Sequence, residues 1–330
     1  MHRSIHPPRG LLPLLMLLAF SACTTIPTRP PPSDGVTFAV KGSPTLLERH
    51  APAFVIEHPE KRHNLIGSAR AEIRPDHSQR IYVTPDKATI YAEKRAFATS
   101  KERYTNLIYR VHFENIPGGF FPYHLGKGKN VGLIVVVTLN SRNLPILYTS
   151  VHTCGCYLAF VPTSSLPEAC FPNGWEKSRQ TVHSESLPGY LDLRDDPREH
   201  RRLTILIRDD THRVKDIWLT PGDSLRDYPT LSAALQPLAT LETLPLNQGE
   251  STSFYETEGP RKGYVKGSQK PRERLLMSWW AFDWRIGEDK KLGQNRQDGP
   301  EFYTSLKPWA RKASDMRDFE AFLTYWEWSL

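Results

Sequence analysis

The middle of the chain alternates hydrophobic and polar residues with the period of β-strands. Residues 80–84 and 88–92 are short runs rich in β-branched and aromatic residues, with a Pro-Asp turn between them. One face of a predicted strand over residues 104–113 carries Leu107, Tyr109, Val111 and Phe113. Its other face carries Asn106, Arg110 and His112. Such alternation predicts strands with one face toward a core.

Residues 131–139 form a nearly continuous apolar run, which predicts a central strand covered on both faces. A turn at residues 140–144 leads into a predicted strand at 145–152, and residues 202–208 and 213–219 flank Asp209-Asp210 as a hairpin. Toward the C-terminus, Pro271 favours a helix that ends at Gly287. Its apolar residues are Leu275, Leu276, Trp279, Trp280 and Ile286.

A final helix is predicted with Ser314 as its N-cap and Asp315 at its positive end. Its apolar stripe consists of Met316, Phe319, Leu323, Trp326 and Leu330. We therefore expect an α+β fold with a predominantly antiparallel β core and helices concentrated in the C-terminal third. Residues 44–225 would form a β-rich domain, and residues 226–330 a mixed α/β portion that packs on the same core.

The N-terminus has the pattern of an export signal. Arg3 and Arg9 precede a leucine-rich run of roughly twelve residues, about 18 Å as a helix and too short for a ~30 Å bilayer core. The run ends in Phe20-Ser-Ala-Cys23. This order resembles a bacterial lipoprotein signal, which implies a signal peptide at residues 1–22 and a lipid-modified Cys23.

The lipoprotein resemblance also implies a location. Cys23 would carry a diacylglycerol and a further acyl chain, which together anchor a protein stably. Thr24 stands where an inner-membrane retention signal would place Asp, so in a Gram-negative source the resemblance implies the periplasmic face of the outer membrane. Residues 23–43 are interpreted as the lipidated cysteine and a tether, in which the proline-rich residues 24–35 would extend about 40 Å.

The charge of the chain excludes little except nucleic-acid binding. The formal net charge is +7, a modest excess in an exported chain, so we expect no nucleic-acid partner. The excess is concentrated in residues 259–274, which hold one acid and six basic residues: Arg261, Lys262, Lys266, Lys270, Arg272 and Arg274. These six are candidates for binding anionic lipid headgroups, an envelope protein or a polyanionic polymer. A solvated basic loop is the alternative.

One segment, His152-Thr-Cys-Gly-Cys156, carries candidate chemistry. Thiolates and an imidazole suit Cu(I) or Zn(II), and Cys170 and His183 are the further candidate ligands. Alternate residues of a flat strand lie nearly 7 Å apart, whereas sulfurs that share a zinc ion lie near 4 Å. Gly155 would therefore have to bend the chain.

The same cysteines have other interpretations. In an oxidising compartment, Cys170 would pair with Cys154 or Cys156 and leave one thiol over. Thiol–disulfide exchange is a further alternative, although it more often uses CxxC. We find no hydrolase, haem or dinucleotide motif. The sequence thus favours a lipid-anchored binding or accessory module, and these residues are a candidate Cu or Zn site. Alternatives are a disulfide-stabilised scaffold that binds envelope partners and an envelope hydrolase of unknown type.

Overall fold

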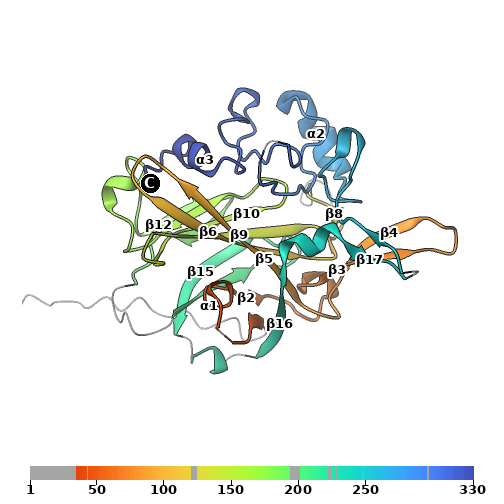
Figure 1. Cartoon of the computed structure of the whole chain (residues 1–330), viewed down its shortest axis with the longest axis horizontal. Coiled ribbons are helices and arrows are strands. Elements are labelled where there is room, and N and C mark those ends of the chain that lie inside the picture. The colour runs from red at the N-terminus through yellow and green to blue at the C-terminus, as the bar shows by residue number, and fades with distance from the viewer. Residues whose placement is uncertain are drawn as a thin grey trace, which may run out of the picture.

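The computed structural model describes residues 35–42, 44–119, 125–193, 201–221, 224–227, 229–247, 249–295 and 297–330. The signal-like segment and Cys23 lie outside this range. The described chain is mostly β, with 39% strand and 15% helix arranged around one large curled sheet (Figure 1). No helix within the described part is long and apolar enough to cross a bilayer.

The large sheet has ten strands, and its neighbouring strands run both parallel and antiparallel to one another. In spatial order they are β11 (Ala159–Pro162), β10 (Pro145–His152), β9 (Gly132–Leu139), β6 (Arg103–His112), β5 (Thr89–Ala98), β16 (Thr230–Pro237), β1 (Val36–Val40), β2 (Ala53–Ile56), β14 (Arg201–Ile207) and β15 (Val214–Pro221). The pairs β5–β16, β16–β1 and β2–β14 are parallel, and the other neighbours are antiparallel. The core predicted as predominantly antiparallel therefore contains a parallel centre.

The predicted strands lie where the hydrophobic pattern placed them. All eight residues of β9 are buried, as expected of a strand covered on both faces. Leu133, Val135 and Val137 pack in the core inside the curl, whereas Ile134 and Val136 pack on the other face against the C-terminal segment. The predicted polar face of β6 is also covered, because Asn106, Arg110 and His112 are all at most 3% exposed.

Two-stranded ribbons decorate the large sheet. They are β3 (Ser68–Ile73) with β4 (Gln79–Thr84), β7 (Asn115–Ile116) with β8 (Gly128–Lys129), β12 (Arg179–Val182) with β13 (Glu185–Pro188), and β17 (Leu244–Pro245) with β18 (Ser251–Thr252). Single 3₁₀ turns are η1 (Arg62–Asn64), η2 (Glu168–Cys170), η3 (Ser224–Asp227), η4 (Leu238–Glu242), η5 (Gly259–Arg261) and η6 (Pro308–Ala310).

The α-helices among the described residues are α1 (Leu46–Arg49), α2 (Pro271–Ala281) and α3 (Phe319–Tyr325), and the last two lie in the C-terminal third. Pro271 begins α2 as predicted, but the helix stops before Phe282, which is left-handed at φ 49°. The N-cap of the last helix is Asp318, whose side chain accepts a hydrogen bond from the Ala321 amide. Ser314, the predicted N-cap, instead accepts a hydrogen bond from the Ser305 amide.

The boundaries expected from composition shift in two places. β1 lies inside the range interpreted as a tether, residues 23–43, yet it is an interior strand of the sheet. A tether can therefore extend no further than Gly35. β16 belongs to the range 226–330 but separates β5 from β1, so both predicted portions build one sheet.

Candidate functional site

A tight turn follows β10 and brings the two neighbouring cysteines together. The His152 amide donates to the Cys156 carbonyl at 2.9 Å, and the Gly155 amide donates to the His152 carbonyl at 2.8 Å. Gly155 has φ 92°, and a Cβ there would lie 2.2 Å from the Tyr303 carbonyl oxygen. The backbone conformation and the close approach both require glycine. The bend at Gly155 that a metal site would require is present.

The turn places the Cys154 and Cys156 sulfurs 2.6 Å apart. Cys154 is buried and Cys156 is half-buried, and neither forms a disulfide in this structure. The hydrogen bond from Cys156 and the positive charge of Lys270 lower the pKa of Cys154, against the effect of burial. The same contact and burial raise the pKa of Cys156 well above its usual value. The pair therefore loses one proton readily and holds the second tightly.

Charged side chains surround the two sulfurs in the interior. The Lys270 ammonium, just before α2, lies 3.4 Å from a carboxylate oxygen of Asp289, and both residues are at most 3% exposed. The Thr153 hydroxyl donates to the other carboxylate oxygen of Asp289. Burial opposes the charge on Lys270, but Asp289, Cys154 and Glu273 together raise its pKa well above the usual value. The ammonium therefore stays charged beside the thiols.

Two further charged groups in this region are only partly satisfied. Glu273 of α2 is buried, and its Oε2 atom makes no hydrogen bond within the described residues. The Lys290 ammonium is likewise without a hydrogen bond there and lies 3.5 Å from the centre of the Tyr303 ring. Burial lowers the pKa of Lys290. We refer to Cys154, Cys156, Lys270, Glu273 and Asp289 as the dithiol cluster.

The other predicted metal ligands do not join the two thiols. His152 is buried, and its Nε2 donates to the His212 carbonyl at 2.9 Å, while its ring packs edge-on against Tyr157. His183 packs on Tyr157 from another side. Cys170 belongs to the apolar cluster around Trp328 and Phe322. No three of His152, Cys154, Cys156, Cys170 and His183, all within the described ranges, bring ligand atoms within 4.8 Å of one another.

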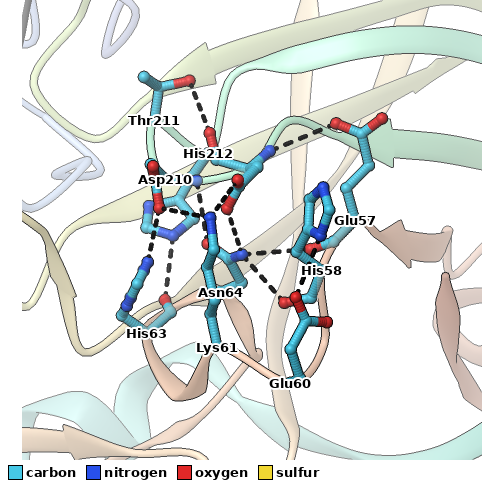
Figure 2. A network of polar contacts seen from close by, with 10 residues as sticks. Glu57, His58, Glu60, Lys61, His63, Asn64, Asp210, Thr211 and His212 are labelled. Atoms are coloured by element: carbon cyan, nitrogen blue, oxygen red, sulfur yellow. Dashed lines mark hydrogen bonds and ion pairs between the residues drawn. The ribbon is translucent and has the colours of Figure 1, made fainter. Parts of the chain in front are cut away.

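A second polar network joins the loop after β2 to the β14–β15 turn (Figure 2). His63, Asp209 and Asp210 are spaced like metal ligands. However, Lys61 already pairs with Asp209 and lies 3.5 Å from Asp210, so an ammonium group occupies the place of a cation. Burial would raise the pKa of Asp209, but hydrogen bonds from Lys61 and Asn64 lower it to about 2. This network ties two loops together.

The basic residues predicted to bind anions do not form one surface. Lys270 is buried in the dithiol cluster, and Arg261 pairs with the buried Glu288 at 2.5 Å. Lys266 donates to Thr252 at 3.0 Å. Arg272 donates to the Gly119 carbonyl at 3.0 Å. Lys262 and Arg274 are exposed, and Arg274 lies over the Trp284 ring at 5.3 Å.

A separate groove of about 660 Å³ lies beside the β3–β4 ribbon. Of the six predicted anion-binding residues, only Lys266 lines it. The charged residues in its lining are Arg74, Arg80, Lys129, Lys266, Glu114 and Glu256. This mixed lining carries a small excess of positive charge and none of the thiols.

The sequence signal for the remaining members of the dithiol cluster was weak. Glu288-Asp289-Lys290-Lys291 is a run of four charged residues, which usually marks a solvated loop. In the structure Glu288, Asp289 and Lys290 are at most 3% exposed. The run is buried because the Lys290 amide donates to the Thr153 carbonyl at 2.8 Å, which docks the segment on the turn after β10.

Comparisons with known proteins found no match from which a function could be assigned. No family model matches the chain, and no curated protein or solved structure is significantly similar to it.

Proposed function

We propose that this chain is a lipid-anchored protein of the cell envelope that passes a disulfide from Cys154 and Cys156 to thiols of exported polypeptides. The anchor is Cys23, on the periplasmic face of an outer membrane, and the described domain is the accessory module that it carries. The observation that supports the exchange is the asymmetric cysteine pair: the two sulfurs are in contact, Cys154 is buried beside the Lys270 ammonium, and Cys156 is the less buried of the two residues.

The asymmetry suits the oxidised form as a disulfide donor. An incoming polypeptide thiolate attacks the sulfur of Cys156, the less buried of the two residues, and the Cys154–Cys156 bond breaks. Cys154 leaves with the electron pair as a thiolate, stabilised by the positive charge of Lys270. A thiol of low pKa is the better leaving group, so cleavage in this direction is favoured.

The second half of the reaction closes the electron balance. A second thiolate of the polypeptide attacks its own sulfur in the mixed disulfide, and Cys156 leaves and takes up a proton. The polypeptide has then lost two electrons and the sulfur pair has gained them. A more oxidising disulfide of another envelope protein must restore the Cys154–Cys156 bond by the reverse exchange.

The geometry favours this role over the copper or zinc site. Two sulfurs that share one zinc ion at ~2.3 Å stand near 4 Å apart, wider than the 2.6 Å found here. No ring nitrogen of His152 lies within 4.8 Å of both sulfurs, and Cys170 packs in the apolar cluster around Trp328. A metal would therefore need the turn to open and to recruit ligands from outside the five predicted residues.

Trapping the intermediate tests the proposal. In cells quenched with acid and then alkylated, Cys154→Ser should accumulate mixed disulfides with exported polypeptides through Cys156. Cys156→Ser should accumulate far fewer, because its remaining thiol is buried. Cys170→Ser is the matched control and should behave like the native protein. Equal trapping by all three variants would contradict the proposed exchange.

Two mass measurements separate the parts of the proposal. The mature N-terminal peptide should carry the mass of an acylated Cys23, which tests the anchor independently of the thiols. Protein purified without oxygen should retain less than one equivalent of copper or zinc. Stoichiometric metal, lost together with Cys154 and Cys156, would instead support the metal site.

A further inference from the structure

An exposed aromatic surface surrounds the end of α2. Trp279, Phe282 and Trp284 are 71%, 77% and 68% exposed, and Leu275 is 77% exposed. Trp280 is less exposed, at 41%. Large apolar side chains with this exposure, gathered in one segment, mark an interaction site.

A second segment extends this aromatic surface. Arg311 donates to the carbonyls of Ala281 and Phe282, which holds the 3₁₀ turn η6 against the end of α2. That turn presents Trp309, which is 82% exposed. Figure 1 shows α2 and α1 on opposite sides of the strands β6 and β9. We call Leu275, Trp279, Trp280, Phe282, Trp284 and Trp309 the tryptophan surface.

Exposed cations accompany the aromatic rings. Arg274 lies over the Trp284 ring, and Lys307 and Lys312 are exposed on the segment that carries Trp309. Asp283, an acid within the same stretch, is bound by the Tyr303 hydroxyl. The three exposed cations outnumber this acid, so the rim of the tryptophan surface carries a net positive charge.

The shape of the tryptophan surface helps to distinguish a protein partner from a bilayer. The side chains are exposed, and grooves found along the described residues beside the β3–β4 ribbon, α3 and η5 are lined by none of them. Anchor residues at protein–protein interfaces more often meet in pockets that exclude water. Projecting indole rings with cations at their rim have the composition of side chains that settle at the headgroup level of a bilayer.

We propose that the tryptophan surface docks on a bilayer that contains anionic lipid. The indole rings enter the headgroup region, while Arg274, Lys307 and Lys312 meet lipid phosphates. This contact is additional to the proposed anchor at Cys23, and it would fix which face of the domain turns to the membrane. It does not depend on thiol exchange.

Fluorescence quenching by brominated lipid tests this docking on the full mature chain. The protein is reconstituted in phosphatidylethanolamine vesicles with or without phosphatidylglycerol. Quenching of tryptophan emission should be strong with phosphatidylglycerol and should fall without it. The charge reversal Arg274→Glu/Lys307→Glu/Lys312→Glu keeps every tryptophan and should lose most of the quenching.

A matched control removes the effect of net charge. Lys41→Glu/Lys87→Glu/Lys94→Glu changes three exposed lysines elsewhere by the same total charge and should quench like the native protein. All these proteins share the same N-terminus, so their differences report the surface whether or not Cys23 is acylated. Equal quenching in both triple variants would overturn the docking. Absence of quenching, together with crosslinking of a polypeptide at Trp309, would overturn it in favour of a protein partner.

Discussion

Two polar clusters hold neighbouring loops of this protein together, and they differ in how deeply they are buried. The network around Lys61, Asp209 and Asp210 is partly exposed, with side-chain exposures of 22–38%, and its groups satisfy one another. The dithiol cluster is almost fully buried, and its Glu273 carboxylate has an oxygen without a hydrogen bond among the described residues.

This difference in burial favours the dithiol cluster as the site of the proposed reaction. Loops can be joined by a satisfied network near solvent at little cost in desolvation, as around Lys61. Burying Lys270, Asp289 and Glu273 beside two thiols is far more costly, because each charge leaves water. Ionisable groups with shifted pKa values, such as Lys270 and Cys154, gather at functional sites. The comparison therefore supports the dithiol cluster as the working centre.

Removing one lysine from each cluster should separate them most strongly. Lys270→Met leaves the buried Asp289 carboxylate without its cation, and we expect a loss of about 3–5 kcal/mol in the free energy of unfolding. Lys61→Met removes a pair near the surface and should cost about 1 kcal/mol or less. Urea unfolding of both variants at neutral pH measures the difference.

The Lys270→Met variant also has a readout beyond stability. Without the ammonium, ionisation of Cys154 becomes harder, so alkylation of the reduced pair at neutral pH should slow. Lys61→Met should alkylate at the native rate. Similar losses of stability in the two variants, with unchanged alkylation, would remove the contrast between the clusters.

Lowering the pH should destabilise the fold through two buried histidines, His152 and His212, that lie between the two clusters. Burial lowers the pKa of both His152 and His212 to about 3. The unfolded chain therefore binds more protons than the folded one between about pH 6.5 and pH 3, so stability is lost as the pH falls through this window. At pH 5 each histidine should cost about 2 kcal/mol relative to pH 7.

A substitution assigns this pH dependence to a residue. The loss between pH 7 and pH 5, measured by urea unfolding, should shrink by about 2 kcal/mol in His152→Gln. His77→Gln changes an exposed histidine and should keep the native loss. If His152→Gln loses as much stability on acidification as the native chain, the histidine is not held neutral by burial.

The sequence predicted the local elements of this fold well, because strand periodicity and turn residues are local signals. The strands at β4, β5, β6, β9 and β10, the hairpin of β14 and β15, and the bend at Gly155 all followed from it. The sequence could not show which strands pair across the chain, and so missed the parallel contacts of β16 with β5 and β1.

The site was predictable only in part for the same reason. Cys154 and Cys156 stood out by spacing, but their charged neighbours come from residues more than a hundred positions away. Lys270 had the pattern of a solvated basic loop, and Asp289 that of a solvated charge run. Their burial depends on the C-terminal segment covering β6 and β10, which no local pattern of either residue reveals.

The smallest expected difference compares two glycines that share a backbone conformation. Gly155 in the dithiol turn has φ 92° and Gly249 has φ 86°, so alanine is strained at both. Around Gly249 nothing lies within 4 Å of an added Cβ, whereas at Gly155 the Tyr303 carbonyl lies at 2.2 Å. Gly155→Ala should therefore lose at least about 1 kcal/mol more than Gly249→Ala in urea unfolding, because the backbone at Tyr303 must shift. The same shift should part the two sulfurs and slow disulfide formation in a glutathione buffer, while Gly249→Ala keeps the native rate. If the glycine variants match in both measurements, the turn is not what holds the sulfurs together.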